Sequence, residues 1–173
     1  EYVAEEQLAT FVDAGGTLLD TAPIYGDGLC EQVIGSLLAK HSLRDRVVLA
    51  GKAGVVRRGG QVVTDGSLRS LLAQLDQSLK DLGTDHLDLW QIHRWDSTVP
   101  LDETMAALDQ AVRSGRVRYA GISNFAGWQT VAAQDSYVRL GGGVPLVSTQ
   151  IEYSLVHREP EIETLPAAAH AGV

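Results

Sequence analysis

Residues 17–26 read TLLDTAPIYG, a short apolar run that turns at Asp20 into a polar loop. The run is nearly continuous in apolar residues, which is typical of a strand buried on both faces of a parallel sheet. A doubly wound dinucleotide-binding fold would carry a G-x-G-x-x-G turn after its first strand, and residues 21–26 do not match that pattern. The stretch therefore favours a closed (β/α)₈ barrel over an open doubly wound sheet.

The same strand pattern recurs along the chain, at residues 47–50, 87–92, 119–122 and 146–151. Helical periodicity separates the strands and is clearest over residues 67–82, with Ser67 as the expected N-cap and Gly83 as the expected end. Further helices are expected over residues 4–14, 29–40, 101–113, 128–140 and 159–171. This alternation predicts one α/β domain over residues 1–173, with five of a barrel's eight parallel strands and right-handed crossovers.

Composition excludes several function classes. The chain has 173 residues and a formal net charge of -8, and its basic residues are dispersed, so a nucleic-acid partner is not expected. No apolar run reaches the roughly 20 residues of a membrane span, which makes a cytoplasmic location the default. Cys30 is the only cysteine and the histidines do not cluster at ligand spacing, so we expect neither a disulfide nor a metal site.

Four ionisable residues fall at or just after the ends of predicted strands. Asp20 ends the first strand, Lys52 follows the second and His93 follows the third, while Tyr25 lies in the loop after Asp20. Catalytic side chains of barrel enzymes come from the carboxyl ends of several strands. Taken singly, each residue fits an ordinary turn, surface or core position better than a catalytic one, but together they indicate a site.

This combination suits carbonyl reduction. A tyrosine is a poor acid near neutral pH, because its reference pKa is about 10. A nearby ammonium favours the phenolate and lowers that pKa, and a carboxylate can hold the ammonium in place. A neutral imidazole adds a hydrogen bond that orients a carbonyl oxygen.

Four motifs resemble those of the aldo-keto reductase family. Residues 20–26 (DTAPIYG) resemble its signature D-T-A-x-x-Y-G, and residues 91–94 (QIHR) resemble its strand-end histidine motif. Residues 121–125 (GISNF) and 150–153 (QIEY) resemble two further family elements. The four motifs occur in the family's order over nearly the whole chain.

The resemblance implies a role for each residue. Tyr25 would be the proton donor, with Asp20 and Lys52 lowering its pKa and His93 orienting the substrate. A nicotinamide cofactor, NADPH rather than NADH, would contact four residues: Asp20, Ser123, Asn124 and Gln150. Arg94 and Trp95 would line the mouth of a site for a small carbonyl substrate, although an ordinary stacked pair on a rim fits them equally.

The resemblance also implies that part of the barrel lies outside these residues. Asp20 belongs to the family's second strand, so the family's first strand and its C-terminal strands with the phosphate-binding loop are expected to be absent. The chain begins at Glu1, which agrees with a fragment.

Two alternatives remain open. The first is a catalytically weak, cofactor-binding regulatory subunit of the same family, similar to the β-subunits of potassium channels, which lack a histidine at the position of His93. The second is a glycosidase, which would need two carboxylates, whereas only Asp20 lies at a strand end. The oligomeric state is not predicted, because the helices show no heptad pattern.

Overall fold

The structure is a computed structural model that describes residues 2–141 and 143–173. Its main sheet contains five parallel strands in the order β1-β2-β5-β6-β7. The strands are β1 (Leu18–Asp20), β2 (Val48–Ala53), β5 (Leu87–Ile92), β6 (Val117–Ser123) and β7 (Thr149–Gln150). Neighbours in this sheet also follow one another along the chain, whereas a doubly wound sheet reverses its strand order at a switch point. The strand order is that of a barrel.

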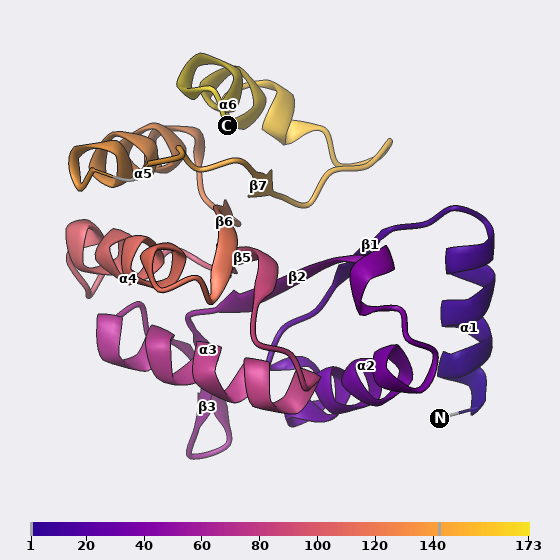
Figure 1. Cartoon of the computed structure of the whole chain (residues 1–173). Coiled ribbons are helices and arrows are strands. Elements are labelled where there is room, and N and C mark those ends of the chain that lie inside the picture. Colours follow the sequence, from indigo (N-terminus) through magenta and orange to yellow (C-terminus); the bar gives the residue numbers. More distant parts are fainter. Residues whose placement is uncertain (1, 142) are drawn as a thin grey trace.

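One helix precedes the first of these strands, and a helix follows each of the five. The helices are α1 (Tyr2–Asp13), α2 (Leu29–Lys40), α3 (Leu68–Leu82), α4 (Leu101–Arg113), α5 (Gly127–Arg139) and α6 (Thr164–Ala171). Each helix from α2 to α5 packs against the next one along the chain, and Figure 1 shows α3 to α6 stacked along one side of the sheet. The described residues therefore form a partial (β/α) barrel, which confirms the predicted fold class.

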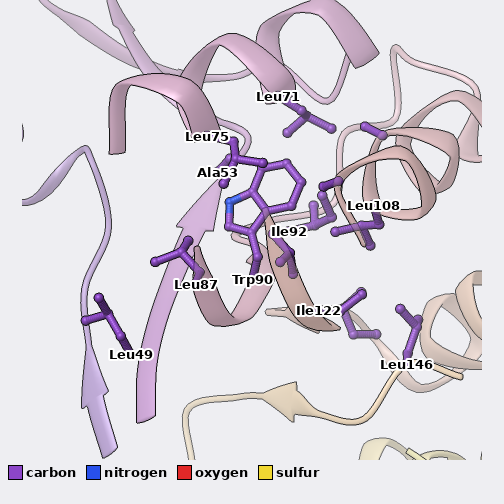
Figure 2. Packing of buried hydrophobic residues seen from close by; sticks show 14 of the residues in the cluster. Leu49, Ala53, Leu71, Leu75, Leu87, Trp90, Ile92, Leu108, Ile122 and Leu146 are labelled. Carbon is purple, nitrogen blue, oxygen red and sulfur yellow. The ribbon is translucent and has the colours of Figure 1, made fainter. Parts of the chain in front are cut away.

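The hydrophobic core lies between the strands and this layer of helices. Trp90 of β5 is fully buried, and its ring lies against the inner face of α3 near Leu71 and Leu75 (Figure 2). Leu71, Leu75 and Leu82 recur at helical spacing along α3 and are all buried. This periodicity is the one that predicted α3, which begins after Ser67 and ends at Gly83 with a left-handed φ of 65°.

A two-stranded hairpin, β3 (Val55–Arg58) and β4 (Gln61–Thr64), lies between β2 and α3 and was not predicted. Its turn is formed by Gly59 and Gly60, whose φ angles of 56° and 82° are both left-handed. Such a turn matches the twist of a hairpin, and glycine adopts it at little cost. The sequence signal was therefore present, as two valine pairs flanking Gly-Gly.

The last predicted helix is wrong at its start. A short 3-10 helix, η3 (Glu159–Glu161), comes first, and α6 begins only at Thr164. Pro166 explains the shift, because a helix that began at Glu159 would hold this proline in its interior, where the ring clashes with the carbonyl of Ile162. In α6 the proline lies in the first turn, where its missing N–H is not needed.

Candidate active site

The predicted site residues gather at the carboxyl edge of the sheet. Asp20 is the last residue of β1, Lys52 lies one residue before the end of β2, and His93 directly follows β5. The strands hold these positions in register, since Thr21 N donates to Ala50 O at 2.9 Å and His93 N donates to Ala53 O at 2.7 Å. Side chains from three neighbouring strands therefore meet at one edge.

Lys52 lies at the centre of the group. Its side chain is 1% exposed, so the ammonium has almost no contact with water. Nζ lies 2.5 Å from Asp20 Oδ2, 3.3 Å from the Thr21 carbonyl oxygen and 3.3 Å from the Tyr25 hydroxyl oxygen. These contacts occupy all three N–H donors of the ammonium. A buried lysine needs such partners, because an unpaired buried charge is strongly destabilising.

Tyr25 belongs to a tight turn after β1. It opens the short helix η1 (Tyr25–Gly28), in which Gly26, Asp27 and Gly28 all have positive φ angles. The turn leaves Tyr25 37% exposed while its hydroxyl contacts Lys52. The ring is therefore partly open to solvent while its hydroxyl is held by a cation.

His93 lies beside Tyr25 and is uncharged at neutral pH. The two rings meet edge to face, with centroids 5.8 Å apart. The pKa of His93 is lowered to about 4, mostly by burial and in part by the positive charges of Lys52 and Arg94, against the opposing effect of Asp20. A neutral imidazole can donate one hydrogen bond to a carbonyl oxygen without being a strong acid itself.

Three polar residues lie at the ends of the next two strands. Ser123 of β6 pairs with Gln150 of β7, and Asn124 N donates to Gln150 O at 2.8 Å. Asn124 has a left-handed φ of 56°, and its side-chain Nδ2 donates to His93 O and to Ser123 Oγ, both at 3.0 Å. Asn124 thus links this group to the backbone that carries His93.

This second group fits an amide such as a nicotinamide carboxamide. Such a head group needs both donors and acceptors. Ser123 Oγ accepts from Asn124 and still has its own proton to donate. Within residues 2–141 and 143–173 the side-chain amide of Gln150 makes no hydrogen bond, and the residue is exposed. Ser123, Asn124 and Gln150 could therefore hold that head group beside His93 and Tyr25.

Arg94 and Trp95, the two residues predicted to line the substrate mouth, have different surroundings in the structure. Trp95 packs edge to face against Phe125 and Trp128, with ring centroids 5.2 Å and 5.3 Å away, while Arg94 is exposed. Sequence reasoning missed both of these aromatic partners of Trp95. Phe125 directly follows the motif residue Asn124, but nothing in the spacing indicated that it would meet a residue 30 positions earlier.

Comparison with known proteins identifies the family. The profile of the Aldo/keto reductase family matches residues 2–173. The chain belongs to this family. Aldo-keto reductase YhdN of Bacillus subtilis is 33% identical over 168 residues, which are 97% of this chain and 49% of that protein.

Two further proteins give similar results. An aryl-alcohol dehydrogenase [NADP(+)] of Phanerodontia chrysosporium is 31% identical over 96% of this chain and 45% of its own length. The solved structure of the glycerol dehydrogenase AKR11B4 from Gluconobacter oxydans aligns with a TM-score of 0.86 at 29% identity, covering 98% of this chain and 50% of that one. The chain thus spans about half the length of the relatives that it matches. Among the described helices, none has the length and apolar character needed to cross a membrane.

Proposed function

We propose that this chain carries the proton-donating half of a nicotinamide-dependent reductase that converts aldehydes or ketones to alcohols. The observation that carries the proposal is the buried ammonium of Lys52, which contacts both Asp20 and the hydroxyl of Tyr25. This arrangement suits a tyrosine that must lose and regain a proton near neutral pH. Membership of a family of oxidoreductases supports the same reaction class.

The proposed chemistry divides among the side chains. Bound nicotinamide supplies the hydride for the carbonyl carbon. Tyr25 donates its hydroxyl proton to the carbonyl oxygen, and the phenolate left behind is stabilised by the ammonium of Lys52, 3.3 Å away. His93, kept neutral, donates a hydrogen bond to the same carbonyl oxygen. Asp20 holds Lys52 in place and limits the net charge of the site.

We propose that Asp20, Ser123, Asn124 and Gln150 bind the cofactor. The last three lie together at the strand ends and have the donors and acceptors that a carboxamide needs. We propose NADPH rather than NADH, with support from the relative whose name includes NADP(+). The same name makes aromatic alcohols and aldehydes a reasonable first substrate panel. We also propose that the five strands work as part of a closed barrel. Among the described residues, the outer strands β1 and β7 each pair with a neighbour on one side only, and the relatives are about twice as long.

The proposal is tested by supplying the full-length protein with NADPH and a panel of aromatic and aliphatic aldehydes. Aldehyde-dependent oxidation of NADPH is the expected result. Tight NADPH binding without oxidation by any aldehyde would instead support the regulatory-subunit alternative. The presence of His93 beside Tyr25 favours the enzyme.

A further inference from the structure

Glu31 is a buried carboxyl group that the proposed chemistry does not use. It lies in the first turn of α2 and is 0% exposed. Neither of its carboxylate oxygens has a hydrogen-bond partner within residues 2–141 and 143–173. A charged carboxylate without partners is strongly disfavoured in such surroundings, so the side chain is better accommodated in its neutral form.

Two groups of α3, the helix packed against α2, affect the ionisation of Glu31. The buried hydroxyl of Ser78 favours the charged form, although it makes no hydrogen bond to the carboxylate, and the negative charge of Asp81 opposes that form. Asp81 itself accepts hydrogen bonds from Gln32 Nε2 at 3.2 Å and Gln77 Nε2 at 2.8 Å. Burial is the largest effect and raises the pKa of Glu31 to about 7.

Two further elements, η1 and α1, contact α2, and their charged groups are paired elsewhere. Glu5 of α1 forms an ion pair with Lys40 at the far end of α2, at 2.7 Å. Asp27 of η1 forms an ion pair with Arg57 of the β3–β4 hairpin, at 3.1 Å. No lysine or arginine is among the groups that shift the pKa of Glu31. A compensating cation is therefore not provided by the described residues around it.

The contact between α2 and α3 is too close to adjust around a new charge. Gly35 lies one turn after Glu31, and a Cβ atom placed on it would be 2.6 Å from the carbonyl oxygen of Leu82 at the end of α3. The two backbones thus touch directly at this point. A charged Glu31 could be hydrated only if water entered between the helices, and this would require them to separate.

We propose that Glu31 is a proton-linked contact between α2 and α3. The neutral carboxyl allows the two helices to pack closely, and release of its proton to solvent loosens them. The contact between α2 and α3 does not depend on reductase activity, so this inference stands or falls independently of the proposed function.

The test compares the unfolding free energies of the full chain and of its Glu31→Gln variant across pH. Glutamine has the same shape and cannot ionise. A carboxyl whose pKa rises from 4.5 in the unfolded chain to about 7 in the folded chain binds more protons when folded, so its stabilising effect is complete below 4.5 and lost as pH rises toward 7. As pH rises from 4.5 to 7, the unfolding free energy of the variant should therefore increase relative to that of the wild type. Above pH 7 the difference between the two proteins should stay constant. The matched control is Glu6→Gln in α1, where the glutamate is exposed and the difference should stay flat.

A second measurement keeps the inference testable if Glu31→Gln does not fold. In the wild-type chain, the NMR signal of the side-chain carboxyl carbon of Glu31 should titrate near pH 7. Above that pH, the protection factors of the α2 amides against hydrogen exchange should fall. Titration near 4.5 would overturn the inference. So would a wild type that is more stable than the glutamine variant at alkaline pH, because the carboxylate would then be charged and paired.

Discussion

The ammonium of Lys52 lies 3.3 Å from the hydroxyl oxygen of Tyr25, although the two residues come from different elements. Lys52 lies in β2, while Tyr25 lies in the turn after β1, and the parallel pairing of these strands brings them together. Asp20 completes the contact from the end of β1, 2.5 Å from the same ammonium. The proton donor therefore depends on strand register as much as on its own identity.

Replacing Lys52 with methionine should remove the cation that stabilises the phenolate of Tyr25. We expect carbonyl reduction to fall by about 10²- to 10⁴-fold, the usual contribution of a positioned acid or base. The measurement is aldehyde-dependent oxidation of NADPH by the full-length protein over a range of pH. Lys80→Met on the exposed side of α3 is the control and should retain activity. Activity of the Lys52 variant within a few fold of the wild type would contradict the proposed role.

His93 should make folding sensitive to acid. Its pKa is lowered from 6.5 to about 4 in the folded chain, so between these values the unfolded chain binds more protons. Stability should therefore fall as pH decreases from 6.5 toward 4, and part of this loss should disappear in His93→Asn. Urea unfolding of both proteins at several pH values measures the effect. His170→Asn, at an exposed site in α6, should keep the wild-type slope, and an unchanged slope in His93→Asn would reject the prediction.

Gln150 should contribute to cofactor affinity. Deleting one hydrogen-bonding side chain and leaving its partner unpaired costs about 1–3 kcal/mol, so Gln150→Ala should weaken nucleotide binding by roughly 5- to 150-fold. Titration of the full-length protein with NADPH, followed by tryptophan fluorescence, measures this change. Gln61→Ala on the β3–β4 hairpin provides the control, because that side chain is also exposed but lies on another sheet. Equal affinities of both variants would remove Gln150 from the proposed cofactor site.

Trp90 should be the most costly core side chain to truncate. It is fully buried between β5 and α3, and Trp→Ala in a core typically costs about 3–5 kcal/mol of unfolding free energy. Trp128 is 60% exposed, so the same substitution there should lower the unfolding free energy much less. Urea unfolding of the two variants gives the comparison, and similar losses would mean that the core is centred elsewhere.

The sequence predicted the elements that depend on local pattern. Continuous apolar runs and leucine periodicity located the five parallel strands and α3, and the rule that barrel sites lie at carboxyl strand ends grouped Asp20 with Lys52. Features that depend on tertiary contacts were not predicted. The burial of Glu31 follows from the close approach of Gly35 to Leu82, and the orientation of Trp95 follows from its packing against Phe125.

The hydroxyl of Tyr25 is the group on which the proposed reaction depends most. In the full-length protein, Tyr25→Phe removes that hydroxyl and keeps the ring beside His93, so turnover of an aldehyde should fall by about 10²- to 10⁴-fold. The dissociation constant for NADPH should stay nearly unchanged. Tyr119→Phe on β6, an exposed tyrosine away from the strand ends, should keep wild-type turnover. Wild-type turnover by Tyr25→Phe would contradict the central claim that this hydroxyl donates the proton.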